Sequence, residues 1–555
     1  MSTSEPSDGA SPTAAEPSGA PSIDVTAASR PHHQLSGRRL LRSTSVVSGM
    51  TLVSRVLGLV RDVVFARYFG ATIVMDAFIV ANRIPNMLRR FFAEGAFSQG
   101  FVPVMAQYRE KNDHPQARQL VDAVAGTLGL GLFVITLIGV IAAPLLVVIV
   151  APGFIGDDGR FDLAILMTRF TFPYLFFVSL TAFGGGILNT YGKFGAPAFT
   201  PVILNVVLIA CAIWLSPHLA EPGMALAYGV LLAGIAQLLF QIPFLAKIHA
   251  IPRPRWHPRH EGVRRIGKLM LPAIFGSSVA QVNVLVGGVI ASMLGVGKIS
   301  LLYYSDRLME FPLGLFSIAL ATVTLPHLSR QHATASMEGF SRTVDWSMKL
   351  VFLIATPAAV GLIVLAEPLV ATIFYGGEFS ASDVRMTALS LQAFSLGLMG
   401  FSLVKILAPA YFAREDTKTP VKIGLIALVV NFVLSVSLAW VLTRAGYAGT
   451  HAGLALATSV AAIVNAWLLW RGLRRDGVVG VTKGWSALLV RFLLANVAMA
   501  LFLMQFARPL AWWLESSLMN RSAWLALTIA GGAIVYFASL LLVGTRPAQL
   551  RLKTD

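Results

Sequence analysis

Long apolar runs separated by short polar segments fill the chain from about residue 44 to residue 545. An α-helix needs roughly 20 consecutive apolar residues to cross the hydrocarbon core of a bilayer, and most runs reach that length. The pattern therefore predicts an all-α polytopic membrane protein with about 14 transmembrane helices. The runs lie near 44–69, 74–106, 119–150, 163–190, 198–216, 223–246, 268–294, 299–329, 345–374, 384–412, 421–443, 449–470, 485–507 and 522–544.

The charges of the polar segments give these helices an orientation. With the N-terminus inside, the inside segments hold about 26 Lys and Arg residues and the outside segments hold about six. The inside segments include 108–118, 247–268, 414–422 and 471–483. Because cytoplasmic loops carry an excess of Lys and Arg, the asymmetry indicates an even number of spans with both termini in the cytoplasm.

Composition agrees with a membrane protein. Apolar residues make up 56% of the chain, charged residues make up 13%, and the mean hydropathy is +0.71. The formal net charge of +17 would suggest nucleic acid in a soluble protein, but here the cytoplasmic loops account for it, and we expect no nucleic-acid partner. The single cysteine, Cys211, excludes an intrachain disulfide and a cysteine metal cluster.

The ends of the chain and a weak internal repeat suggest the domain organisation. Residues 1–36 are rich in Ser, Pro, Ala and Gly, so we expect a disordered cytoplasmic tail, which ends at residue 43 with the basic flank "SGRRLLR". Gly70 and Pro85 match Gly297 and Pro312 at one constant offset, six spans later. This spacing predicts two parallel six-helix lobes, followed by two extra helices and a cytoplasmic C-terminus. The predicted boundaries are 1–43, 44–250, 251–472 and 473–555.

Charged residues interrupt the first, second and eighth spans. Seven arginines (Arg55, Arg61, Arg67, Arg83, Arg89, Arg90 and Arg307) stand against five carboxylates (Asp62, Asp76, Glu94, Asp306 and Glu310). Charges inside a bilayer are costly, so these side chains should face each other or a water-filled cavity. One interpretation is an ion-pair network that fixes helix packing. The surplus of arginine favours a central cationic cavity for an anionic ligand, since the guanidinium fork suits phosphate.

Other motifs in the chain carry no chemistry. "SMLGVGKIS" (292–300) lacks the first glycine and the Ser or Thr of a phosphate-binding loop. The basic, His-rich "RPRWHPRH" (253–260) is best explained as a solvated loop. Pro85 breaks the second span near its charged section, as either a gate or a static kink. We therefore expect no ATPase site, no metal site and no cofactor.

Four stretches resemble the bacterial lipid II flippase MurJ (MviN) family. They are "SRVLGLVRD" (54–62), "DAFIVANRIPNMLRRFFAEGAFSQGFVPV" (76–104), "YYSDRLMEFPLGLFSIALATVTLP" (303–326) and "KTPVKI" (418–423). The resemblance runs from about residue 44 to the C-terminal region. It implies the fold of multidrug/oligosaccharidyl-lipid/polysaccharide exporters, with two six-helix lobes around a central cavity. It also implies a substrate, lipid II, the undecaprenyl-diphosphate-linked peptidoglycan precursor.

The resemblance also implies roles for particular residues. The family's substrate-binding arginines align with Arg55, Arg61, Arg89 and Arg307, and its cavity or gate carboxylates align with Asp62, Asp76, Glu94 and Asp306. The last two helices of the family form a groove for the lipid tail. Some relatives hold sodium between the seventh, eleventh and twelfth helices with carboxylate ligands. Those spans carry the neutral Asn283 and Asn431 here, which argues against such a site.

Taken with the charge pattern, the resemblance implies a flippase, not an enzyme. It would move lipid II from the inner to the outer leaflet of the bacterial plasma (inner) membrane by alternating access, for peptidoglycan synthesis and cell-wall biogenesis. We expect a monomer surrounded by membrane lipids, with the peptidoglycan synthesis machinery as a candidate partner. The alternatives are an exporter of another polyprenyl-linked glycan, a multidrug-type antiporter, which the arginine surplus disfavours, and a non-transporting scaffold.

Overall fold

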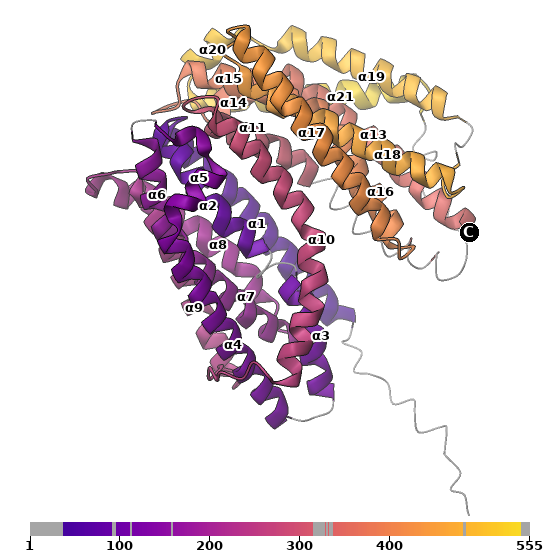
Figure 1. The fold of residues 1–555 in the computed structure, drawn as a ribbon. Helices are drawn as coiled ribbons and strands as arrows, with labels where there is room; N and C mark the ends of the chain where they lie inside the picture. Colours follow the sequence, from indigo (N-terminus) through magenta and orange to yellow (C-terminus); the bar gives the residue numbers. More distant parts are fainter. Residues whose placement is uncertain are drawn as a thin grey trace, which may run out of the picture.

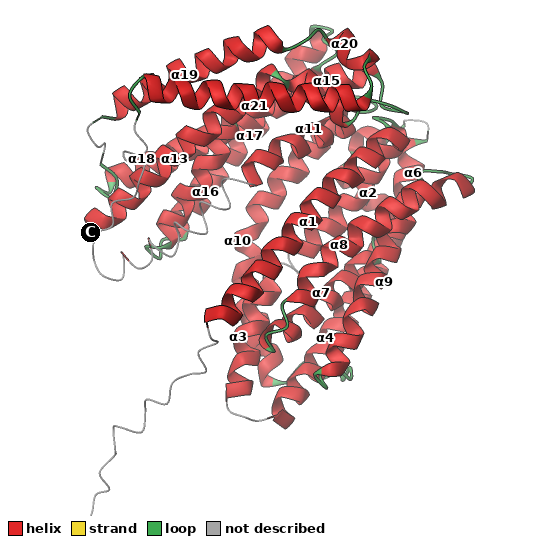
Figure 2. Cartoon of the chain, turned by 180° about the vertical axis from the view of Figure 1, so that it is seen from behind, coloured by secondary structure: helices red, strands yellow, loops and turns green. Residues whose placement is uncertain are grey.

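The computed structural model describes residues 37–90, 96–110, 114–156, 159–314, 328, 331, 337–480 and 484–545. Within these ranges the regular structure is helical, apart from one isolated bridge between Gly376 and Phe379 (Figure 2). The predicted all-α class is therefore confirmed.

The first half of the chain forms one bundle, coloured indigo to purple in Figure 1. In it α1 packs on α8, α2 on α6, and α7 on both α9 and α3. Its helices are α1 (Gly37–Phe69), α2 (Ile73–Arg89), α3 (Ala96–Glu110), α4 (His114–Ile141), α5 (Ala143–Val150), α6 (Arg160–Thr171), α7 (Tyr174–Thr190), α8 (Gly195–Ala210) and α9 (Met224–Lys247), with the short turns η3 (Pro152–Phe154), η4 (Cys211–Leu215) and η5 (Ser216–His218).

The second half forms another bundle, in which α17 packs on α18, and α18 also packs on α15 and α16. Two long C-terminal helices, α19 and α21, pair with each other and lie against α13 and α14. The helices are α10 (Glu261–Ser292), α11 (Lys298–Pro312), α13 (Met337–Val364), α14 (Ala366–Ile373), α15 (Ala381–Leu396), α16 (Leu398–Phe412), α17 (Lys418–Arg444), α18 (Thr450–Arg475), α19 (Trp485–Phe506), α20 (Leu510–Glu515) and α21 (Leu518–Leu542).

Each of the 14 predicted spans overlaps one described helix or two consecutive helices, with ends shifted by a few residues. Nine helices in the described ranges are long and apolar enough to cross a membrane, or ten if α15 and α16 form one bent span. Helix α1 begins at Gly37, a few residues before the first span expected near 44–69. The tail predicted at 1–36 lies outside the described residues.

Several spans consist of two helices where the sequence predicts one. Proline explains two of these breaks: Pro144 lies in the first turn of α5, and Pro173 directly precedes α7. A proline has no N–H to donate, so it starts a helix more easily than it continues one. Pro85 behaves differently from the predicted break, since α2 continues through it to Arg89. The kink between α15 and α16, 41° at Gly397, has no proline.

The two bundles meet at one end and diverge toward the end at which α1 begins (Figure 1). At the joined end, Gly70 before α2 and Gly297 before α11 both have left-handed φ angles, +59° and +78°. A side chain on Gly70 would collide with the backbone of Glu378, and one on Gly297 with that of Ala71. These glycines thus let the bundles touch through their backbones, and their matching conformations support the predicted repeat.

Helix α10 connects the two bundles over most of their height. It packs against α3 of the first bundle and against α17 of the second. Where α10 and α11 face α1 and α2, the helices leave the space described next, so α10 forms a wall shared by both bundles.

Candidate substrate cavity

A cavity of about 1150 Å³ lies between the bundles. Its walls come from α1, α2, α7, α8 and α9 of the first bundle, and from α10, α11, α16 and α18 of the second. Pockets for drug-sized ligands usually measure roughly 300–1000 Å³, so this cavity has room for a larger polar group.

The structure brings most of the predicted site residues to this one cavity. All four predicted arginines line it, and so do two of the predicted carboxylates. Among the described residues, seven cationic side chains and three carboxylates line the walls, a surplus of four positive charges. The cations are Arg55, Arg61, Arg83, Arg89, Arg90, Arg307 and Lys405, and the carboxylates are Asp62, Asp306 and Glu310. The expected cationic cavity is therefore present.

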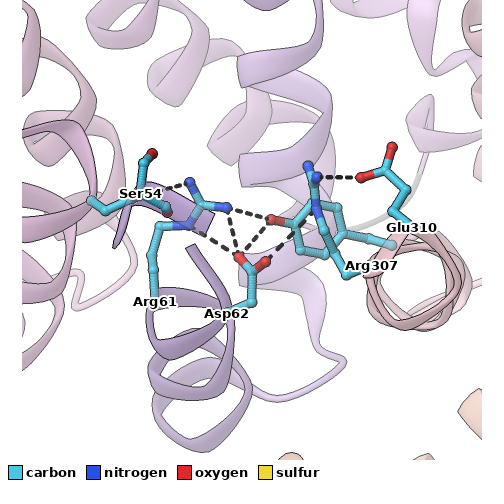
Figure 3. A network of polar contacts seen from close by, with 7 residues as sticks. Ser54, Arg61, Asp62, Arg307 and Glu310 are labelled. Atoms are coloured by element: carbon cyan, nitrogen blue, oxygen red, sulfur yellow. Dashed lines mark hydrogen bonds and ion pairs between the residues drawn. The ribbon is translucent and has the colours of Figure 1, made fainter. Parts of the chain in front are cut away.

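Asp62 is the centre of a network that joins α1 to α11 (Figure 3). Its Oδ1 lies 2.7 Å from Nη2 of Arg61 and accepts a 2.8 Å hydrogen bond from the Tyr303 hydroxyl. Its Oδ2 lies 3.7 Å from Nε of Arg307. Two guanidinium groups from opposite bundles thus share one buried carboxylate, and they keep unused N–H groups.

The outer parts of both guanidiniums are oriented by further contacts. Arg61 donates from Nη1 to Oδ1 of Asn205 at 3.1 Å, and Arg307 donates from Nη1 to Glu310 at 3.0 Å. The Arg307 guanidinium also lies over the Tyr303 ring, 4.9 Å from its centroid. Such contacts restrict the rotamers of both arginines and so prepare them for a ligand.

Arg83 and Arg89 of α2 make different contacts. Nη1 of Arg83 is buried and has no hydrogen-bond partner among the described residues. A side chain on Gly288 of α10 would overlap the Arg83 guanidinium, so the glycine makes room for it. Arg89 donates from Nε to Asn86 at 3.2 Å. A buried guanidinium with an unused donor fits an anion-binding wall better than an ion-pair network.

Asp76 lies outside the cavity, at the joined end of the bundles. It is fully buried and accepts hydrogen bonds from the N–H groups of Gly297, at 2.6 Å, and Ser300, at 2.9 Å, and from the Ser300 hydroxyl at 2.6 Å. Nη1 of Arg160 is 3.9 Å away. Of the two roles expected for this carboxylate, cavity or gate, its position therefore suits a gate. Glu94, the fourth predicted carboxylate, lies outside the described residues.

A neutral polar cluster joins α10, α17 and α18. Asn431 donates to Asn283 at 2.6 Å, and its own oxygen lies 3.4 Å from the hydroxyls of Ser435 and Thr458. No group of three or more His, Cys, Asp and Glu side chains suited to a metal ion occurs in the described part of the chain. The Asn–Asn hydrogen bond thus joins α17 directly to α10.

Sequence reasoning missed two residues of the network, Tyr303 and Asn205. Tyr303 precedes Arg307 by one helical turn, so the four-residue spacing was a usable signal. Asn205 had no such signal, because it reaches Arg61 from α8, far away in the sequence. Lys405 of α16 was missed for the same reason.

Comparison with solved structures places the fold in a known class. A multidrug resistance MATE family transporter of the MOP superfamily, in an inward-facing conformation, superposes with a TM-score of 0.63. The match covers 77% of this chain and 95% of that chain at 16% identity, so the likeness concerns the fold alone. The two bundles with a cavity between them thus form a multi-span membrane protein with a MATE-like fold.

The family follows from closer matches. The family model described as lipid II flippase MurJ matches residues 65–523, and the chain belongs to this family. A probable lipid II flippase MurJ of Vibrio cholerae is 47% identical over 525 residues, 93% of this chain and 99% of its own length. The lipid II flippase MurJ of Burkholderia cenocepacia is 41% identical over 521 residues, 92% and 99% of the two chains. A solved lipid II flippase MurJ in an inward closed conformation has a TM-score of 0.72 at 26% identity, covering 89% of this chain and 99% of that chain.

Proposed function

We propose that this protein flips lipid II from the inner to the outer leaflet of the bacterial plasma membrane. Membership of the lipid II flippase family supports the substrate. The observation that carries the proposal is the surplus of four positive charges in a cavity that lies between two bundles. An anionic lipid headgroup is the ligand that such a cavity stabilises, and a cationic drug is disfavoured there.

The diphosphate of the substrate binds to the predicted arginines, Arg55, Arg61, Arg89 and Arg307. Arg83 adds a donor from the wall that α2 shares with α10. The sugar and peptide part occupies the remaining cavity, and the polyprenyl tail stays in lipid along α19 and α21. No bond is made or broken, so the protein acts as a transporter and needs no catalytic group.

The orientation follows from the positive loops, with both termini in the cytoplasm. The diverging end of the bundles then faces the cytoplasm, and the joined end faces outward. Lipid II enters from the inner leaflet while Asp76 holds the joined end closed through α11. Separation of the joined end, with approach of the bundles at the other end, releases the headgroup outward.

Depletion of the protein in its own host tests the function. In cells that lack another flippase, lipid II should accumulate in the inner leaflet and become inaccessible to an enzyme that cleaves it only from outside. Re-expression should restore cleavage. Unchanged access after depletion would refute the proposal. Accumulation of a different lipid-linked glycan would identify the alternative exporter, since any polyprenyl diphosphate would use the same arginines.

A further inference from the structure

The segment 251–260, between α9 and α10, is an ordered strap with an unusual side-chain composition. Its sequence is "IPRPRWHPRH", with three arginines and one tryptophan in ten residues. The backbone of the strap is hydrogen-bonded to the first bundle. It crosses α4 of the first bundle and ends at His260, whose Nδ1 accepts a hydrogen bond from the N–H of Gly262 in the first turn of α10.

Asp122 of α4 fixes the backbone of the strap. Its carboxylate accepts a 2.7 Å hydrogen bond from the N–H of Arg253, and its carbonyl accepts a 3.0 Å bond from the N–H of Arg255. Asp122 is 5% exposed. One turn further along α4, Gly126 lies directly under Arg255, where any side chain would collide with the strap backbone. A buried carboxylate and a glycine are thus used to hold the backbone of a surface loop.

The side chains of the strap point away from the protein. Arg253, Arg255 and Arg259 are exposed, and none of their guanidiniums has a hydrogen bond or ion pair in the described part of the chain. Trp256 is 60% exposed and Ile251 is 45% exposed. Water does not favour an exposed tryptophan, but the interface of a bilayer does, because the ring is apolar and its N–H is polar.

The depth of the strap agrees with a bilayer interface. Gly126 and Val150, the last residue of α5, are 24 residues apart along α4 and α5. At 1.5 Å per residue this is at most about 36 Å. With Val150 at the outer edge, this length places the strap near the inner boundary of the roughly 30 Å hydrocarbon core, close to the inner headgroups.

We propose that the strap binds the phosphate groups of anionic phospholipids in the cytoplasmic leaflet. The three unpaired guanidiniums contact the phosphates, and Trp256 and Ile251 insert among the adjoining glycerol and acyl groups. Fixing the backbone to Asp122 and Gly126 reduces the entropy lost on binding. The proposal depends on the orientation stated above and not on the transported substrate. Depth and tryptophan favour a lipid surface over a nucleic acid or a protein, which would need the strap in water.

Fluorescence quenching by brominated lipids tests the proposal without any transport assay. The full-length protein is placed in bilayers that contain either brominated phosphatidylglycerol or brominated phosphatidylcholine at equal mole fraction. The signal of Trp256 is the difference between the natural protein and W256F. We expect the anionic lipid to quench this signal about fivefold more strongly than the zwitterionic lipid. No quenching by either lipid would overturn the proposal, and equal quenching would overturn its anionic part.

Two matched pairs of variants separate the strap from general electrostatics. The triple variant R253Q/R255Q/R259Q should lose the preference for phosphatidylglycerol. The variant R264Q/R265Q/K268Q removes three exposed charges from nearby α10 and should keep the preference for phosphatidylglycerol. G126A should displace the strap and reduce the preference, whereas G129A, where nothing lies within 4 Å of the added methyl group, should not. If both variants of either pair lose the preference for phosphatidylglycerol to the same extent, a specific role for the strap is refuted.

Discussion

Asp62 and Asp76 are both buried carboxylates within helices of the first bundle, and they are neutralised in different ways. Asp62 shares its charge with the guanidiniums of Arg61 and Arg307 at the wall of the cavity. Asp76 accepts two backbone N–H groups and one hydroxyl group at the start of α11, with Arg160 as a more distant cation. Both arrangements join the two bundles, since α11 belongs to the second.

We propose that this difference separates substrate binding from closure of the joined end. At Asp62, two cations share one carboxylate, so part of their charge is left for a ligand. At Asp76, each donor is directed at the carboxylate and little is left for anything else. The same residue type therefore makes an exchangeable contact in the cavity and a closed contact at the joined end. The predictions below test this distinction.

Removal of a cavity arginine should have the largest effect. We expect R61A and R307A, each as the sole copy, to abolish growth while the protein still inserts into the membrane. Each substitution removes a cation that neutralises the buried carboxylate of Asp62, and it also removes a ligand of the diphosphate. R61K should partly rescue, since it keeps the charge and loses the fork. R169A, at an exposed position on α6, is the control. Normal growth of both alanine variants would show that Asp62 and its arginines are structural.

Neutralising Asp76 should open the joined end. D76N loses charge-assisted hydrogen bonds worth about 2 kcal/mol in total, which shifts the closed-to-open ratio about 30-fold. Cysteines at Ala71 and Val296, beside Gly297, report closure by cross-linking once Cys211 is replaced by Ser. The yield of the cross-link should fall in D76N and stay high in D62N. A fall in both variants would remove the distinction between the two carboxylates.

Membrane voltage should shift the inward-to-outward equilibrium through the surplus charge of the cavity. One charge moved through the whole field changes the energy by roughly 2.3 kcal/mol per 100 mV, so a third of that path shifts the equilibrium about fourfold. We expect cysteines on opposite faces of the cavity to change accessibility when the potential is collapsed at constant pH gradient. The bound diphosphate cancels part of the surplus, so the loaded form should respond less. If the ratio of inward to outward cysteine accessibility stays unchanged, an ion gradient or the substrate gradient is the driving force instead.

Asp416 is a control for Asp76, because it also accepts backbone N–H groups but lies outside the spans. Hydrogen bonds from the side chain and N–H of Thr419 hold the pKa of Asp416 below its usual value. A carboxyl group with a lowered pKa in the folded state stabilises the fold at pH values above its ordinary pKa. This stabilisation is lost as the pH falls from that value through the lowered pKa. We expect D416N to lower Tm by about 1 °C at pH 7 and by less toward pH 3.5. A difference that is independent of pH would contradict this explanation.

The spans and the charged residues of the site could be predicted from the sequence because both depend on local properties. A run of apolar residues has the length of a bilayer wherever it packs, and Arg61 inside such a run needs a polar neighbour in any fold. The separate positions of Asp62 and Asp76 could not be predicted from the residue types. They depend on where α11 crosses α1 and α2, and the proximity of Arg83 to Gly288 depends on where α10 crosses α2. The kink at Gly397 likewise results from packing, since no proline causes it.

The contacts at the joined end also determine how the bundles can separate. They include hydrogen bonds to backbone atoms, such as the 2.9 Å bond from the N–H of Glu378 to the carbonyl of Arg67. A hydrogen bond has lost most of its strength by about 3.5 Å, so an opening of about 1 Å already breaks it. At that separation water does not yet fit between the backbones, and the freed N–H and C=O groups stay unsatisfied. We therefore expect half-open arrangements to be the least stable, and separation to be an all-or-none transition between two populated states.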